Sequence, residues 1–346
     1  MIILVCNAGP EAGFGHLMRA RALATALIDL GERCALLGPS LAYSNEGDCG
    51  LFDEWMPIEH WTSDEEEARR LLSIAGSIGA DSAVVDDYRA NNTYQELLYR
   101  SDFPWLQFDT SIDGPRFPSI LVNPSPGARS EDYQQVMERP DTVFLLGPRF
   151  AVLRPEFLGV VRAPRRSAPL RVLLTFGAGD DLGASLFVLG ELISGTPLDL
   201  HFVVVSGLHN PQNPSLRQFV RERGSDRVSL LVNPPSLSEV YSSADIAIMS
   251  GGTSIYEAAA CGVPMLLLPT ADNQVKQSKA WAGSGAAVYL GRFGEVSGTQ
   301  LLEALSVLVS NSEILDQMSL AGCRLVDGCG AVRVARSVAR LSERLG

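Results

Sequence analysis

A histidine near the amino terminus and a pair of glycines in the second half are the residues best suited to chemistry. His16 follows the glycine-rich loop 7–15 and opens a helix, where the helix dipole disfavours a charged imidazolium. A neutral ring can act as a base near pH 7; the alternative is a histidine that only hydrogen-bonds the loop. Gly251 and Gly252 stand between a strand and a helix, so their open backbone N–H groups suit a phosphate.

The stretch that contains these glycines predicts a β-α-β unit. An apolar run over 245–249 is typical of a buried strand, and a second run over 265–268 follows a helix that ends at Cys261. The candidate phosphate ligands are Ser250, Gly251, Gly252, Thr253 and Ser254, of which Thr253 or Ser254 caps the helix. Ser254 and Glu257 are also spaced as a capping box, which leaves a purely structural role open.

Acidic residues follow two of the predicted strands in the first half. The strand 82–85 delivers Asp86, Asp87 and Tyr88 to its carboxyl end, and the next strand delivers Asp109. Ligands bind at this edge in open α/β sheets, so the acids are candidates for general acid–base catalysis. Capping of the following helix is the alternative for each acid.

Other charged residues near the glycine loops have two interpretations each. Arg19 lies one turn after His16 on the same helix face, where it can reach a ligand phosphate or a surface carboxylate. The loop that contains Gly177 ends at Asp180 and Asp181. These two acids do not predict a metal pair, because nothing nearby completes a coordination shell and acids commonly cap helix starts.

The length predicts two domains. With 346 residues, the chain exceeds the size of most single cores. We predict an N-terminal α/β domain over 1–161, a proline-containing linker over 162–169 and a C-terminal α/β domain over 170–346, with the last helix a candidate to pack back on the first domain. The segment 40–61 shows little periodicity, and its tryptophans are a candidate platform for a sugar.

Composition excludes several classes of function. The formal net charge of −12 argues against nucleic-acid and anionic-membrane partners, since no basic surplus exists to neutralise their phosphates. The six cysteines form no C-x-x-C pair and the four histidines show no ligand spacing, so we expect reduced thiols and no metal site. No signal peptide or membrane span is recognised. These features predict a cytoplasmic protein.

The amino-terminal glycine loop also excludes a nicotinamide enzyme. The sequence G-F-G-H over 13–16 lacks the third glycine of the dinucleotide fingerprint. No acidic residue follows the next strand at the position that binds ribose. We therefore expect no cofactor.

Two motifs together resemble a known family. Residues 13–19 read G-F-G-H-L-M-R, and residues 250–258 read S-G-G-T-S-I-Y-E-A. They are similar to the nucleotide-sugar hydrolases of pseudaminic acid biosynthesis and their spore-coat polysaccharide relatives, which are related to the N-acetylglucosaminyltransferases of peptidoglycan synthesis. Shorter stretches, such as V-D-D-Y over 85–88, follow in the family's order. The resemblance implies the GT-B fold, two Rossmann-like doubly wound domains facing an interdomain cleft.

The resemblance also implies roles for particular residues. UDP would bind the C-terminal domain, with Val232 at the uracil, Glu257 at the ribose and the glycine loop at the pyrophosphate. Asn273 and Gln274 would approach the sugar. The candidate catalytic residues are His16, Tyr88, Asp86 and Asp87, and the candidate binding residues are Gly13, Phe14, Gly15, Arg19, Asp109, Gly177, Asp180, Val232, Ser250, Gly251, Gly252, Thr253, Ser254, Glu257, Asp272, Asn273 and Gln274.

The reaction that the resemblance implies is hydrolysis of a UDP-activated acetamido-deoxy sugar to UDP and free sugar. Water would attack the anomeric carbon with inversion and without a metal ion, and His16 would act as a base worth about 10² to 10⁴ in rate. Loop amides and a helix N-terminus would stabilise the departing diphosphate. The alternatives are glycosyl transfer to a small acceptor, sugar-nucleotide 2-epimerisation with Asp86, Asp87 and Asp109 as acids and bases, and a non-catalytic nucleotide-binding module.

Overall fold

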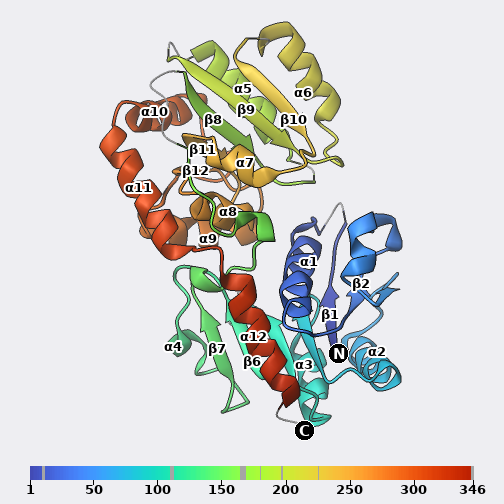
Figure 1. The fold of residues 1–346 in the computed structure, drawn as a ribbon. Coiled ribbons are helices and arrows are strands. Elements are labelled where there is room, and N and C mark those ends of the chain that lie inside the picture. Colours follow the sequence, from blue (N-terminus) through green and yellow to red (C-terminus); the bar gives the residue numbers. More distant parts are fainter. Residues whose placement is uncertain are drawn as a thin grey trace. The chain divides into compact units, whose positions relative to one another are not determined.

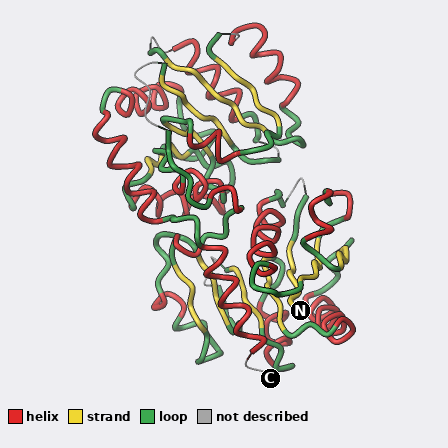
Figure 2. The backbone as a smooth tube through the Cα atoms, viewed as in Figure 1, coloured by secondary structure: helices red, strands yellow, loops and turns green. Residues whose placement is uncertain are grey.

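The computed structural model describes residues 1–9, 12–109, 113–163, 169–179, 181–195, 198–224 and 226–343. The chain divides into two compact units (Figures 1 and 2). Unit 1 comprises Met1–Pro155 together with Gly328–Gly346, and unit 2 comprises Glu156–Asp327. The division falls before the predicted linker over 162–169, of which residues 164–168 lie outside the described part of the chain.

Unit 1 is built on a parallel sheet that, within the described residues, has seven strands in the order β3-β2-β1-β4-β5-β6-β7. Its strands are β1 (Ile2–Cys6), β2 (Cys34–Gly38), β3 (Glu54–Pro57), β4 (Ser82–Asp86), β5 (Trp105–Phe108), β6 (Ile120–Asn123) and β7 (Val143–Leu146). Its helices are α1 (Gly15–Ile28), α2 (Asp64–Ile78), α3 (Asn92–Arg100), α4 (Ser130–Tyr133) and α12 (Gly330–Glu343). The strand order reverses between β1 and β4, whose carboxyl ends adjoin through the register pair Cys6 and Asp86.

Both faces of this sheet are covered by helices. Successive residues of a strand point to opposite faces. Ile2, Leu4 and Cys6 therefore join a core cluster with α1 and α12, whereas Ile3 and Val5 join a second cluster with α2 and α3. Burial on both faces explains why these strands are continuous apolar runs rather than alternating ones.

The last helix of the chain belongs to unit 1. Val334, Ala335 and Val338 of α12 are fully buried in the same cluster as α1, and α12 crosses one face of the unit 1 sheet (Figure 1). A Cβ atom on Gly330 would lie 2.0 Å from the carbonyl oxygen of Ala151, so glycine is needed where the helix begins. The chain thus returns to unit 1 after completing unit 2.

Unit 2 is a second parallel sheet with, in the described residues, six strands in the order β10-β9-β8-β11-β12-β13. Its strands are β8 (Leu170–Thr175), β9 (Leu200–Ser206), β10 (Val228–Val232), β11 (Ile246–Met249), β12 (Met265–Leu267) and β13 (Ala287–Tyr289). Its helices are α5 (Ala184–Gly195), α6 (Asn213–Phe219), α7 (Leu237–Ser242), α8 (Ser254–Ala260), α9 (Asp272–Gly283), α10 (Gly298–Val309) and α11 (Ser312–Leu325). Here the order reverses between β8 and β11.

The prediction of two doubly wound α/β domains is confirmed. One strand was outside the prediction: β3 lies in the segment 40–61, where no strand pattern is visible. Its residues are partly exposed because β3 is an edge strand, so the sequence shows no buried apolar run there. The strand is defined by its hydrogen-bonded pairing with β2. Among the described residues, every helix falls short of the length and apolar content that a bilayer crossing demands.

Shortening Val334 to alanine should destabilise unit 1. The side chain is fully buried between α12 and the sheet, so Val334→Ala should lower the free energy of unfolding by roughly 1 to 3 kcal/mol. Urea unfolding followed by tryptophan fluorescence measures this, since three of the four tryptophans lie in unit 1. Val307→Ala is the matched control, because Val307 of α10 is 57% exposed. Equal effects of the two changes would contradict this packing.

Candidate functional site

His16 meets a buried carboxylate at the end of β4. It is the second residue of α1 and only 8% exposed, and its Nδ1 lies 2.8 Å from Oδ1 of Asp86. An ionised carboxylate only accepts hydrogen bonds, so Nδ1 carries a hydrogen, and in the neutral ring Nε2 is the acceptor. The ring of Tyr88 stands edge-on to His16, with 4.8 Å between centroids. The structure therefore brings two of the other three candidate catalytic residues, Asp86 and Tyr88, into contact with the ring of His16.

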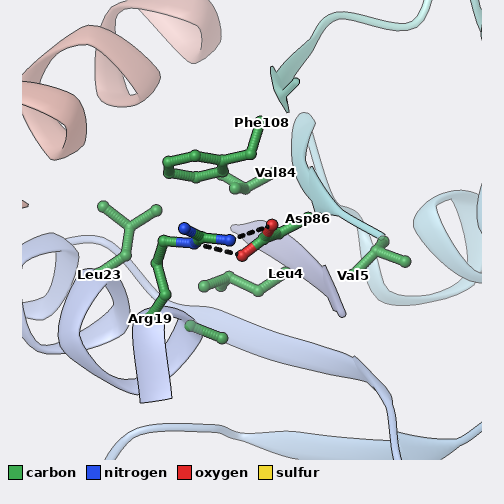
Figure 3. Close-up of a pocket in the computed structure, with 8 residues that line it drawn as sticks. Leu4, Val5, Arg19, Leu23, Val84, Asp86 and Phe108 are labelled. Atoms are coloured by element: carbon green, nitrogen blue, oxygen red, sulfur yellow. Dashed lines mark hydrogen bonds and ion pairs between the residues drawn. The ribbon is translucent and has the colours of Figure 1, made fainter. Parts of the chain in front are cut away.

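Asp86 is held from a second side by Arg19. Arg19 donates from Nε to Oδ2 at 2.5 Å and from Nη2 to Oδ1 at 2.7 Å, and its guanidinium stacks on Phe108 at 4.7 Å (Figure 3). Burial raises the pKa of Asp86, but Arg19 and His16 outweigh it and hold the pKa at about 2. The partner of Arg19 in the structure is thus a buried carboxylate and not a surface one.

Asp87 takes a structural role next to Asp86. Asp87 is the first residue after β4. Asp87 accepts hydrogen bonds from the side chain of Arg89 at 2.7 and 3.0 Å and from its backbone N–H at 3.0 Å. Arg89 stacks in turn on Trp61 at 4.5 Å. Asp87 therefore fixes the turn after β4 and is not brought to His16.

The glycine loop before His16 folds back on itself. Gly9 and Gly13 exchange backbone hydrogen bonds of 3.1 and 2.8 Å, and Gly13 has a φ of +75°, which favours glycine. Phe14 occupies the N-cap position of α1, directly before Gly15, and its ring meets Tyr43 edge-on at 5.2 Å. These contacts lead the chain into α1 and place His16 in its first turn.

Asp109 helps to hold the loop that follows β5. Its carboxylate pairs with the buried guanidinium of Arg116, and its carbonyl accepts from the Tyr133 hydroxyl at 3.1 Å. Arg116 also donates to the side chain of Asn92 at 2.7 Å. This network gives Asp109 a structural function in the loop that follows β5.

In unit 2, Gly251 packs directly on α9. A Cβ atom there would lie 2.3 Å from Oγ of Ser278 and 2.7 Å from the carbonyl oxygen of Gln274, so the approach requires glycine. Oε1 of Gln274 accepts from the Gly251 N–H at 3.3 Å, and Nε2 of Gln277 donates to the Gly251 carbonyl at 2.9 Å. The conformation of the loop is therefore set by α9. Sequence reasoning missed Gln277, although its spacing of three from Gln274 places both on one helix face.

The loop continues into α8 at Ser254. Ser250 is buried, Gly252 is partly buried and Thr253 is exposed. Thr253 is the N-cap residue, and its side chain makes no capping hydrogen bond. The positive end of α8 is thus presented by backbone N–H groups rather than covered by the Thr253 hydroxyl.

The other candidate residues of unit 2 lie on loops and termini along the carboxyl edge of its sheet. Val232 ends β10, and Gly177 follows β8 with a φ of +104°. At the start of α9, Asn273 is exposed and Asp272 pairs with Arg292 at 2.9 Å. Glu257 lies within α8 and is partly buried.

Of the two acids expected to cap a helix, only Asp181 lies within the described residues. Asp180 lies outside the described residues. Asp181 accepts from the backbone N–H groups of Gly183 at 3.0 Å and Ser185 at 3.2 Å at the start of α5, which confirms the capping interpretation for this acid. Within the described part of the chain, no group of three or more acidic, histidine or cysteine side chains is placed to hold a metal ion.

Both candidate regions occupy the same place in their sheets. His16 and Asp86 lie at the carboxyl ends of β1 and β4, where the strand order of unit 1 reverses. Gly177 and Gly251 follow β8 and β11, where the order of unit 2 reverses. Ligands of doubly wound sheets bind at this reversal. The topology thus favours one binding region in each unit.

The ion pairs of Asp86 predict a pH-dependent stability. Its pKa is lowered from 3.8 to about 2 in the folded chain, so its contribution is complete above about pH 4 and is lost as the pH falls to 2. The stability advantage of the wild type over Asp86→Asn should therefore shrink by roughly 2 kcal/mol between pH 5 and pH 2. Urea unfolding at each pH measures it. Asp53→Asn, at an exposed ion pair, should show no such trend.

Gly251 should not tolerate even a methyl group. Gly251→Ala forces Ser278 and Gln274 away from the loop and should cost roughly 1 to 3 kcal/mol of unfolding free energy. The neighbouring Gly252→Ala is the matched control, since its Cβ would meet nothing closer than 3.9 Å. Thermal unfolding of both variants compares them. A Gly251→Ala protein as stable as the control would refute the close packing of the loop on α9.

Comparison with known proteins identifies the fold. The family model "UDP-glucoronosyl and UDP-glucosyl transferase" matches residues 241–321, which include the Gly251 loop and α9. The spore coat polysaccharide biosynthesis protein SpsG of Bacillus subtilis is 23% identical, over 99% of this chain and 98% of its own.

Two solved structures are similar over nearly the whole chain. MurG of Acinetobacter baumannii has a TM-score of 0.68 at 14% identity, covering 98% of this chain and 99% of its own. The UDP-GlcNAc 2-epimerase of Neisseria meningitidis, solved with UDP-GlcNAc bound, has a TM-score of 0.63 at 12% identity, covering 98% of this chain and 100% of its own. The chain therefore has the GT-B type of fold, with two Rossmann-like domains.

Proposed function

We propose that this protein is a nucleotide-sugar enzyme of the glycosyltransferase type, which moves a sugar from UDP to an acceptor hydroxyl. The observation that carries the proposal is the contact of His16 with Asp86 at the strand reversal of unit 1, because it leaves Nε2 as a base. The match of residues 241–321 to a family of UDP-sugar transferases supports UDP as the leaving group. Similarity to SpsG supports a role in building a surface polysaccharide.

In the proposed reaction, His16 Nε2 takes the proton of the acceptor hydroxyl. The acceptor oxygen bonds to the anomeric carbon as the bond from that carbon to the UDP oxygen breaks, which inverts the configuration. Asp86 stabilises the imidazolium that forms, through its hydrogen bond to Nδ1. Base catalysis of this kind is worth about 10² to 10⁴ in rate.

Unit 2 is proposed to bind the nucleotide. The backbone N–H groups from Gly252 to Ser254 would bind the pyrophosphate, because Thr253 makes no capping hydrogen bond and an anion can take that place. Glu257 would bind the ribose and Val232 would lie at the base. Asn273 and Gln274 would approach the sugar, with Oε1 of Gln274 already accepting a hydrogen bond from the Gly251 N–H.

Transfer replaces hydrolysis as the leading proposal. Hydrolysis rests on sequence resemblance alone, whereas the matched family model describes transferases, and a relative that is similar over 99% of this chain is a polysaccharide biosynthesis protein. Epimerisation is less favoured because Asp86, Asp87 and Asp109, its candidate acids and bases, are each ion-paired with an arginine. The chemistry of the acceptor is what separates transfer from hydrolysis.

A UDP-sugar panel tests the proposal. The protein is incubated with UDP-GlcNAc and related UDP-sugars, with and without a polysaccharide acceptor fraction, and UDP release, free sugar and 2-epimer are quantified. We expect UDP release that requires the acceptor, and a loss of about 10² to 10⁴ in kcat for His16→Gln with UDP affinity preserved. His60→Gln, at an exposed histidine, is the control. Release of UDP and free sugar without acceptor would establish hydrolysis instead.

A further inference from the structure

Arg19 lies largely buried in unit 1, paired with Asp86. Its side chain is 13% exposed, two of its three donor nitrogens bind the two oxygens of Asp86, and its guanidinium plane lies against the ring of Phe108 (Figure 3). The apolar side chains of Leu4, Leu23 and others line the small cavity around this pair. An arginine that binds a phosphate at two points uses two parallel N–H donors. In Arg19, the donors Nε and Nη2 already bind Asp86.

Arg19 and His16 converge on the same carboxylate oxygen. Nη2 of Arg19 lies 2.7 Å from Oδ1 of Asp86 and 3.1 Å from Nδ1 of His16. Both nitrogens are donors when Nδ1 carries the hydrogen, so each donates to Oδ1 and neither to the other. Oδ1 therefore accepts two hydrogen bonds while Oδ2 accepts from Nε of Arg19. The carboxylate cannot rotate without breaking these bonds.

Arg19 supplies the positive charge that balances the negative charge of Asp86 beside His16. Among the residues that the structure describes, the charged or titratable groups in contact with the imidazole are Arg19 on its own helix, Asp86 at the end of β4 and Tyr88 in the turn beyond. Cys6 at the end of β1 lies within electrostatic reach of Asp86, and burial raises the pKa of its thiol, so that it stays neutral. The positive charge of Arg19 offsets the negative charge of Asp86.

We propose that Arg19 is a positioning residue that keeps His16 a neutral base with its free electron pair on Nε2. Without Arg19, the buried carboxylate of Asp86 would lack a counterion, and its nearest remaining partner is His16. Taking up a proton would turn His16 into that counterion. The imidazolium has no free nitrogen and cannot accept a proton from an acceptor hydroxyl. Arg19 thus acts on catalysis through Asp86 and not through substrate.

The chain offers a matched control two residues further along α1. Arg21 forms a similar two-point ion pair with Asp48, with Nε to Oδ1 and Nη2 to Oδ2 both at 2.7 Å. The exposures are also similar, with 15% for Arg21 and 5% for Asp48 against 13% for Arg19 and 7% for Asp86. Arg21 therefore reproduces the ion pair but lies outside the His16 cluster.

The test compares Arg19→Met with Arg21→Met. Ring ¹⁵N NMR signals of His16, one of only four histidines, distinguish imidazolium from each neutral tautomer and are assigned with His16→Gln. At pH 7 we expect a neutral Nδ1–H ring in the wild type and in Arg21→Met, and an imidazolium in Arg19→Met. Arg19→Lys restores the positive charge and should restore the neutral ring. If Arg19→Met does not fold, Arg19→Gln, which can donate one hydrogen bond to Asp86, provides the same comparison.

The kinetic readout rests on the proposed function, whereas the NMR readout does not. With an active donor and acceptor pair, Arg19→Met should lower kcat at pH 7 by roughly 10-fold or more, with KM for the UDP-sugar changed less than about 3-fold. Activity should recover as the pH rises and the imidazolium loses its proton. A neutral ring in Arg19→Met at pH 7 would overturn the inference. An imidazolium there without any detectable turnover by the wild type would instead count against the proposed function alone.

Discussion

The site of unit 1 depends on one buried carboxylate. Asp86 lies at the end of a central strand, where an ionised group without partners would be strongly disfavoured. The two-point bond from Arg19 and the hydrogen bond from His16 supply partners for both of its oxygens. Both donors come from the first two turns of α1, so the ion pair also fixes this helix against β4. The orientation of His16 is a consequence of that attachment.

The two units place different kinds of chemical group at the reversal of their strand order. In unit 1 the groups that converge are side chains, and their chemistry is that of an acid–base pair. In unit 2 the groups are mainly backbone amides, and the side chains of Gln274 and Gln277 hold the loop that presents them. An imidazole suits proton transfer, whereas a row of N–H groups suits a diphosphate. We therefore propose proton transfer for unit 1 and nucleotide binding for unit 2.

Much of the fold could be predicted because its signals are local. The apolar runs of β1, β4, β8 and β11 are visible in the sequence, since strands buried on both faces carry few polar residues. The edge strand β3 escaped prediction because its residues are partly exposed and its pairing with β2 is a contact between distant residues. The burial of α12 within unit 1 depends likewise on contacts across the full length of the chain.

The sequence alone determined that His16 would begin a helix after a glycine loop and that Asp86 and Asp87 would lie at the carboxyl end of a strand, because turns, caps and apolar periodicity act over a few residues. Only the tertiary structure decided which acid meets His16. That choice depends on which face of the sheet α1 covers, and it joins Arg19 to a carboxylate 67 residues away. In the same way, the need for glycine at position 251 arises from the approach of α9, since the interfering atoms belong to Gln274 and Ser278.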